Sequence, residues 1–218
     1  MATRVMASET PPRPDSITSV PRTTSMDETR ALIADHLTGS ARTVEASATA
    51  LVADAARAAD TLIAAIRGGR KILCFGNGGS ATQASHFAGE LIGRYKETRR
   101  PYAALALGGD VGSVTCIAND FGYGALFERQ IEGLAEPGDV AVGLTTSGTS
   151  ENVVRGIAAA RAKGAATIAL TGARGLTGAE ADHVLAVPST VTAHIQEVHL
   201  MLIHAWCTEI DRVLMAGA

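Results

Sequence analysis

A short glycine-rich segment and the helix expected after it hold the residues best suited to chemistry. Residues 76–80 read Gly-Asn-Gly-Gly-Ser and follow an apolar run at 71–75. Glycines after a buried strand let backbone N–H groups approach a ligand, and the next helix start adds unpaired N–H groups that favour an anion. His86 and Glu90 are four residues apart, so their side chains share one helical face. The segment predicts an anion cradle leading into a helix with a candidate metal ligand and a carboxylate.

A second loop, at residues 145–150, is rich in hydroxyl groups. It reads Thr-Thr-Ser-Gly-Thr-Ser, follows an apolar run at 139–144, and opens another helical stretch. Hydroxyls and backbone amides at a helix N-terminus can bind a monophosphate, whereas the lysine of a nucleotide P-loop is missing. Helix capping alone would explain one of these residues. So many hydroxyls around a single glycine therefore favour a phosphate site.

The last helical stretch, 193–214, contains several polar residues that could bind a ligand. Gln196 and His204 lie on one face, whereas His194 and His199 point elsewhere. The apolar neighbours of His204 predict a largely buried imidazole. Another polar segment, residues 119–122 (Asn-Asp-Phe-Gly), reads by itself as a turn with an Asx signal.

The pattern of apolar runs predicts an α/β fold. Strand-like runs at 71–75, 103–107, 139–144, 167–171 and 183–187 alternate with helical stretches at 80–96, 122–134, 151–163 and 193–214. An Ala-rich helical region at 27–67 precedes them, with a break expected at Gly39–Ser40. Such alternation indicates a parallel sheet covered on both faces, with ligands at the carboxyl edge of the strands.

The composition of the chain limits the classes of binding partner and the cellular compartment that we expect. The chain has 218 residues, a net charge of −3 and 4% aromatic residues, which give no reason to expect a nucleic-acid or membrane partner. Three widely spaced cysteines, Cys74, Cys116 and Cys207, favour free thiols and a reducing cytoplasm. The Pro- and Ser-rich residues 1–25 are expected to form a disordered extension before a single domain at 26–218, and Met26 is an alternative start.

Read together, these segments resemble the phosphoheptose isomerases, the sedoheptulose 7-phosphate isomerases of the sugar-isomerase (SIS) fold. The resemblance runs from about Met26 to the C-terminus in the family's order and spacing. The two loops are generic to sugar-phosphate-binding relatives, whereas the pair His86/Glu90 combined with Gln196/His204 is more specific. The matching motifs lie at residues 76–80, 86–95, 119–122, 146–152 and 195–204.

The resemblance implies an α/β/α sandwich with a five-stranded parallel sheet, assembled as a homotetramer. It implies a Zn²⁺ cofactor held by His86, Glu90, Gln196 and His204. The residues that it implies for sugar-phosphate binding are Asn77, Gly78, Gly79, Glu90, Asn119, Asp120, Thr145, Thr146, Ser147, Ser150 and Gln196. Thr145 and Thr149 stand where relatives often have Ser and Asn.

Ketose–aldose interconversion suits these residue types. One proton moves between adjacent carbons through an enediol(ate), so a base must accept it and an acid must serve the carbonyl oxygen. Glu90 is the candidate base and His204 the candidate acid. Gln196 and His204, eight residues apart, would be about 12 Å apart along a straight helix. We therefore expect a composite site in which a neighbouring copy supplies one of them.

Three alternatives compete with this interpretation. A non-catalytic SIS-domain protein of the replication-initiator-associating type would lack the catalytic carboxylate and the last histidine, whereas Glu90 and His204 are both present. A sugar-phosphate-sensing regulator would need a DNA-binding domain, for which the N-terminal segment is too short. A dinucleotide enzyme fits poorly, because residues 76–80 lack a full G-x-G-x-x-G and the acidic residue about 20 positions later.

Overall fold

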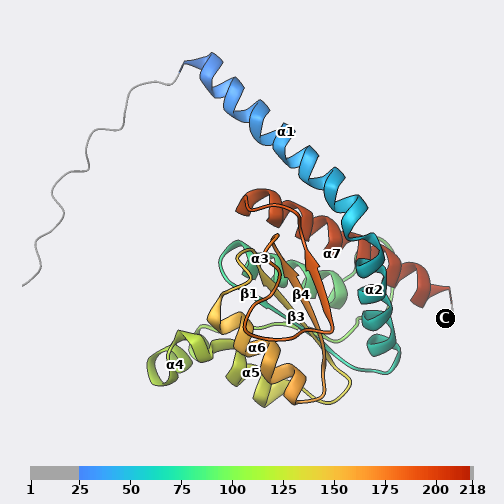
Figure 1. The fold of residues 1–218 in the computed structure, drawn as a ribbon. Coiled ribbons are helices and arrows are strands. Elements are labelled where there is room, and N and C mark those ends of the chain that lie inside the picture. Colours follow the sequence, from blue (N-terminus) through green and yellow to red (C-terminus); the bar gives the residue numbers. More distant parts are fainter. Residues whose placement is uncertain (1–24, 217–218) are drawn as a thin grey trace, which may run out of the picture. The chain divides into compact units, whose positions relative to one another are not determined.

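Five parallel strands form the centre of the computed structural model, which describes residues 25–216 (Figure 1). Their order in the sheet is β2-β1-β3-β4-β5. The strands are β1 (Ile72–Gly76), β2 (Ala104–Ala106), β3 (Val140–Thr145), β4 (Ala166–Thr171) and β5 (His183–Ala186). Because all the strand pairs are parallel, the loops that follow the strands meet at one edge of the sheet. This confirms the five-stranded parallel α/β fold predicted from the sequence.

Helices connect the strands and cover the sheet. They are α1 (Met26–Ala50), α2 (Val52–Arg67), α3 (Gly79–Ile92), α4 (Val111–Phe121), α5 (Leu126–Leu134), α6 (Glu151–Ala162) and α7 (Thr192–Met215). A short 3₁₀ turn at Tyr123–Ala125 joins α4 to α5. The turn predicted at 119–122 is wrong for its first three residues, because α4 is helical through Phe121, and α3 ends at Ile92, four residues before the predicted 96.

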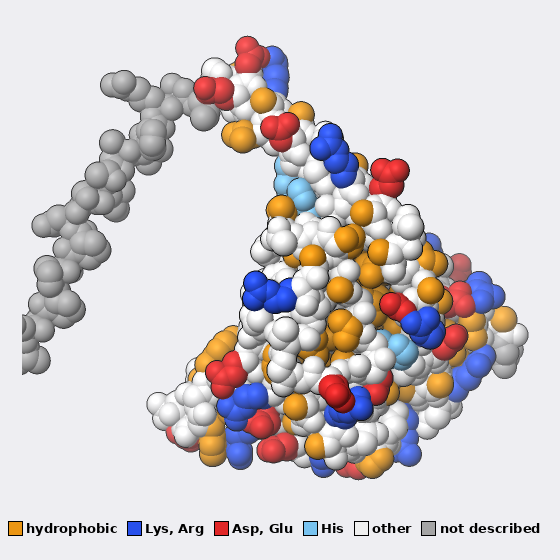
Figure 2. All heavy atoms as spheres, in the orientation of Figure 1, with side chains coloured by type: hydrophobic (Ala, Val, Ile, Leu, Met, Phe, Trp, Pro, Cys, Tyr) orange, Lys and Arg blue, Asp and Glu red, His pale blue; other side chains and the backbone are white. Residues whose placement is uncertain are grey.

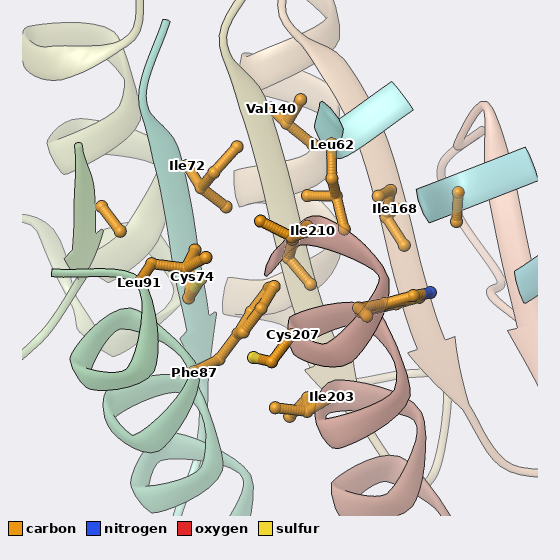
Figure 3. Close-up of a cluster of buried hydrophobic side chains, with 14 of the residues drawn as sticks. Leu62, Ile72, Cys74, Phe87, Leu91, Val140, Ile168, Ile203, Cys207 and Ile210 are labelled. Atoms are coloured by element: carbon orange, nitrogen blue, oxygen red, sulfur yellow. The ribbon is translucent and has the colours of Figure 1, made fainter. Parts of the chain in front are cut away.

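Two hydrophobic cores lie on opposite faces of the sheet. Alternate residues of β1 divide between them: Ile72 and Cys74 join one core, whereas Leu73 and Phe75 join the other. The first core is closed by α2, α3 and α7, with Phe87, Ile203 and Cys207 among its labelled side chains (Figure 3). The second is closed by α4, α5 and α6. This period-2 division makes the three-layer sandwich.

The expected break at Gly39–Ser40 is wrong, because α1 is helical through both residues and ends at Ala50. A Cβ atom at Gly39 would lie 2.6 Å from Cε1 of His194, so this glycine allows α1 and α7 to approach closely. Glycine costs about 1 kcal/mol relative to alanine inside a helix. The close approach of α1 to His194 of α7, rather than a bend in α1, therefore explains why a glycine stands at position 39.

Contacts divide the chain into two units, Met1–His36 and Leu37–Ala218, and the second contains the sheet. Residues 1–24 lie outside the described part, so the disordered extension expected over 1–25 stays a prediction. Within residues 25–216, no helix combines the length and apolar character needed to cross a membrane. Acidic and basic side chains are interspersed on the face shown in Figure 2, with hydrophobic side chains reaching the surface between them.

Candidate functional site

The two polar loops expected from the sequence lie beside each other. Gly76 at the end of β1 pairs with Leu144, one residue before the end of β3. The glycine-rich loop therefore leaves the sheet next to residues 145–150, which we call the hydroxyl loop. The following helices, α3 and α6, begin at Gly79 and Glu151. Both helix N-termini thus lie at the carboxyl edge of the sheet, where backbone N–H groups can bind an anion.

Three polar side chains meet where the second half of α3 lies against α7. The Nε2 atoms of His86 and His204 are 3.1 Å apart, and Oε1 of Glu90 lies 3.3 Å from the His86 Nε2. His204 is half-buried rather than largely buried, which corrects the sequence-based expectation. Its ring packs on Tyr95 and His86 rather than in the apolar core formed by its neighbours Ile203 and Trp206. We call His86, Glu90 and His204 the histidine cluster.

Gln196 lies at a different place from the histidine cluster. A Cβ atom on Gly79 would come within 2.7 Å of its Nε2, so the Gln196 amide lies over the first residue of α3. Its backbone carbonyl accepts a hydrogen bond from Nε2 of Gln83 at 2.6 Å. Within one chain, Gln196 therefore faces the start of α3, whereas His204 faces its second half.

The hydroxyl loop is a network of short contacts. Oγ1 of Thr145 lies 3.3 Å from Oγ of Ser147 and 3.1 Å from Oγ of Ser150. Ser150 occupies the N-cap position of α6 but makes no side-chain capping hydrogen bond. Its hydroxyl is therefore available for a ligand, which argues against capping as its purpose. Gly148 has φ +71°, and a Cβ atom there would lie 1.8 Å from the carbonyl oxygen of Gly175, so only glycine fits.

The Asn77 side chain is held by two residues that the sequence did not single out. Its Nδ2 donates to Oδ1 of Asn152 at 2.8 Å, and its Oδ1 accepts from Asn152 Nδ2 and from the Tyr123 hydroxyl, both at 2.9 Å. One Asn77 N–H remains for a ligand. Asn152 belongs to the matching motif at 146–152 without a predicted role, and no periodic signal marks Tyr123, because the roles of both residues depend on long-range contacts.

Asn119 and Asp120 lie at the end of α4 and are exposed. Asn119 donates to Oδ1 of Asp120 at 2.7 Å, and Cys116 Sγ lies 3.6 Å from Asp120 Oδ2. These contacts are local, so they do not by themselves join the two residues to the loops. Tyr123, three residues after Asp120, makes the link to the site through Asn77.

Two groups on α7 owe their protonation states to burial. His199 is fully buried, and desolvation lowers its pKa to about 4, although the hydrogen bond of its Nε2 to the Thr171 carbonyl opposes the shift. Its Nδ1 has no partner in the structure. Burial, with a smaller contribution from Glu90, raises the pKa of Cys207 to about 12. Both groups are therefore neutral near pH 7.

The histidine cluster offers the donor atoms that zinc prefers, two imidazole nitrogens and a carboxylate oxygen. Zinc bonds of about 2.0–2.1 Å place neighbouring tetrahedral ligands about 3.3 Å apart, close to both distances in the cluster. Across residues 25–216, however, no group of three or more His, Cys, Asp or Glu gathers closely enough to hold a metal ion. The residue types and pairwise distances fit zinc, but one chain does not present a complete site.

Comparisons with known proteins agree with the fold. The SIS domain family matches residues 35–172, which is more than half of the chain. A phosphoheptose isomerase from Bradyrhizobium sp. (strain ORS 278) is 43% identical over 195 residues, covering 88% of this chain and 98% of the relative. One from Aquifex aeolicus is 48% identical over 157 residues, covering 72% and 82%.

Solved structures show the same likeness. The phosphoheptose isomerase from Neisseria gonorrhoeae superposes with a TM-score of 0.77 at 38% identity, covering 84% of this chain and 99% of that one. The one from Francisella tularensis superposes with a TM-score of 0.81 at 33% identity, covering 84% and 98%. The likeness therefore includes the sheet and both loops of the candidate site.

Proposed function

Since the chain belongs to the SIS domain family and, within it, to the phosphoheptose isomerases, we propose that it interconverts sedoheptulose 7-phosphate and D-glycero-D-manno-heptose 7-phosphate. The observation that carries this proposal is the meeting of Glu90 and two histidines in a chain that also has the hydroxyl loop. The cluster supplies acid and base groups, and the loop supplies phosphate ligands. A non-catalytic SIS protein would not need the acid and base groups of the cluster.

Glu90 and His204 divide the proton transfers. Glu90 takes a proton from C1 of the ketose, and the electron pair left behind forms a C1–C2 double bond while the C2 oxygen takes a proton from His204. Return of a proton from Glu90 to C2, with loss of the O1 proton to His204, gives the aldose. Atoms and charge balance without a redox cofactor.

The substrate phosphate binds the hydroxyl loop in this proposal. Thr145, Thr146, Ser147 and Ser150 supply hydroxyls, and the N-terminus of α6 adds backbone N–H groups. Gly78 and Gly79 let the sugar approach the start of α3, where Asn77 presents an amide, and the Gln196 that contacts the sugar is the one supplied to the metal. Asn119 and Asp120 complete the binding set from the end of α4.

Zinc is the proposed cofactor, with His86, Glu90, Gln196 and His204 as its ligands. A bound zinc ion would polarise the carbonyl oxygen as a Lewis acid. Since cation binding stabilises the ionised carboxylate, a bound zinc ion would make Glu90 a weaker base. Activity after chelation and after zinc addition tests this assignment.

We further propose a homotetramer with composite sites, working in a reducing cytoplasm. His86, Glu90 and His204 come from one chain, so Gln196 is the ligand that a neighbouring copy supplies. Support comes from an apolar groove of about 360 Å³ between α7 and the helices before the sheet. Its lining includes Leu51, Val52, Val198, Met201 and Trp206. Because Met201 and Val52 are more than half exposed, a second copy would bury them.

Hybrid assemblies test the shared site. A Glu90→Gln chain still provides Gln196 to its neighbour, and a Gln196→Ala chain still provides Glu90. Mixing the two inactive variants under conditions of subunit exchange should restore part of the activity, because some sites then contain both residues. Light scattering measures the assembly. No recovery in exchanged hybrids, or full activity of a monomer, would contradict the composite site.

The direct test of the function is to incubate the purified protein with sedoheptulose 7-phosphate and follow formation of an aldoheptose phosphate by NMR. Wild-type protein should convert it, and Glu90→Gln should not. Binding of the sugar phosphate without turnover by the wild-type protein would favour the non-catalytic alternative.

A further inference from the structure

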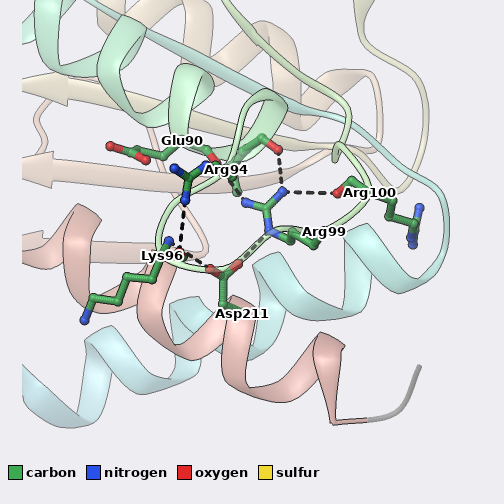
Figure 4. A network of polar contacts seen from close by, with 7 residues as sticks. Glu90, Arg94, Lys96, Arg99, Arg100 and Asp211 are labelled. Atoms are coloured by element: carbon green, nitrogen blue, oxygen red, sulfur yellow. Dashed lines mark hydrogen bonds and ion pairs between the residues drawn. The ribbon is translucent and has the colours of Figure 1, made fainter.

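A buried ion pair joins the two helices that carry the acid and the base. Nε of Arg99 donates to Oδ1 of Asp211 on α7 at 2.6 Å, and the side chains are only 4% and 8% exposed (Figure 4). The other ion pairs with both side chains on helix surfaces, such as Arg212 with Glu209, are much more exposed. Burying two charges is costly, and an apolar pair is often at least as stable, so stability alone explains such a pair poorly.

The remaining donors of Arg99 meet the end of α3. Nη2 donates to the backbone carbonyl of Glu90 at 2.8 Å, and Nη1 donates to that of Leu91 at 2.9 Å. These carbonyls belong to the last turn of the helix, which lacks intrahelical partners and carries the negative end of the dipole. Figure 4 shows the Glu90 carboxylate extending away from Arg99, so the guanidinium holds the backbone of this residue and leaves its carboxylate free.

Asp211 also orders the segment between α3 and Arg99. Its Oδ2 accepts from the backbone N–H of Lys96 at 3.5 Å. The preceding residue, Tyr95, stacks on the imidazole of His204, with ring centroids 5.8 Å apart and planes at 24°. Asp211 and His204 are seven residues apart on α7, close to two helical turns, so they lie on the same side of the helix. One carboxylate therefore connects the backbone of Glu90 with the ring that packs on His204.

We propose that Arg99 and Asp211 are positioning residues that fix the distance between the Glu90 carboxylate and the His204 imidazole. This rests on the proposed isomerase function. Their hydrogen-bond partners lie in α3, in residues 96–100 and in α7, whereas the hydroxyl loop belongs to β3 and α6. Loss of the pair should therefore disturb proton transfer without weakening phosphate binding.

The test compares Asp211→Asn with a matched control, Asp139→Asn. Asp139 is 1% exposed and accepts from the ammonium and backbone N–H of Lys71 and from the backbone N–H of Glu136, but it lies at the amino edge of the sheet. Both variants leave a buried or half-buried cation without its partner, so both should lower Tm. Steady-state rates are measured with sedoheptulose 7-phosphate at a temperature where every variant is folded.

We expect Asp211→Asn to lower kcat about tenfold or more, since small misplacements of catalytic groups have large effects, and to change KM less than twofold. Asp139→Asn should keep kcat within twofold. Arg99→Lys, which keeps the charge but cannot reach all its acceptors, should lower kcat to a lesser extent and serves if Asp211→Asn does not fold. Asp211→Glu should recover part of kcat. If Asp211→Asn has the same kcat as the control Asp139→Asn, the proposal is overturned. If Asp211→Asn does not fold, the same comparison is made between Arg99→Lys and Asp139→Asn.

A second measurement separates this inference from the proposed function. Imidazole NMR signals of His86 and His204 should shift in Asp211→Asn, or in Arg99→Lys, and stay in place in Asp139→Asn. If wild-type protein does not convert the sugar, the proposed function fails, and the NMR result alone decides the positioning role. Unchanged His204 signals in the Asp211 or Arg99 variant would refute it.

Discussion

The candidate site has two halves with different side chains. The half made by α3 and α7 holds titratable groups in contact with one another, the histidine cluster. The half made by β3 and α6 holds hydroxyls and amides, and the hydroxyl loop contains no titratable residue. The histidine cluster can transfer protons, whereas the hydroxyl loop can only bind the substrate. The difference predicts that substitutions in the first half change kcat and those in the second change KM.

The largest expected effect is on the base. Glu90→Gln keeps the shape of the side chain but removes the proton acceptor, so kcat should fall on the order of a hundredfold or more with KM little changed. His204→Ala should also lower kcat. Initial rates with sedoheptulose 7-phosphate measure both, and Glu97→Gln, an exposed residue beyond α3, is the control. Near-normal turnover by both site variants would break the division between the halves.

A second prediction concerns His199, the buried histidine of α7. The folded pKa of His199 is about 4, below its usual 6.5, so the unfolded state binds more protons between these values. Neutral His199 therefore contributes to the free energy of unfolding above pH 6.5, and this contribution is lost as pH falls toward 4. The free energy of unfolding should fall by about 2 kcal/mol between pH 8 and pH 5 from this group. Urea unfolding of wild type and His199→Gln measures it. The variant should show a smaller loss, and equal slopes would contradict this structural role.

The third prediction concerns the binding half. Replacing both Ser147 and Ser150 with alanine removes two phosphate ligands, so KM should rise about tenfold while kcat changes little. Because Ser150 makes no capping hydrogen bond, Tm should change little. Thr149→Ala is the matched control within the same loop. A loss confined to kcat would show that the two loops have exchanged roles.

The smallest effect is expected at Tyr123. Tyr123→Phe removes one hydrogen bond to Asn77, which is worth about 0.5–1.5 kcal/mol, so KM should rise a few fold. Calorimetric binding of the sugar phosphate measures the change, with Tyr102→Phe, a buried tyrosine just before β2, as the control. Unchanged affinity would mean that Asn152 alone fixes the Asn77 amide.

The sequence alone determined the parallel sheet and the residues at its edge. Apolar runs as short as 71–75 predict buried strands because such residues must leave water, and His86 and Glu90 share a face because helical spacing is local. It also failed locally at Gly39, where a glycine that usually marks a break lies inside a continuous helix. The family motifs indicated the chemistry through residue types and order.

Only the tertiary structure decided which of these residues meet. His86 and His204 are 118 positions apart, and their contact depends on the packing of α3 against α7. The same packing buries Arg99 with Asp211, places Gln196 over Gly79 and leaves His204 half-exposed. The pairing of Asn77 with Asn152 and Tyr123 likewise requires β1 to lie beside β3. Such contacts come from non-local packing, in which one side chain's position depends on every layer beneath it, and spacing along the chain does not encode them.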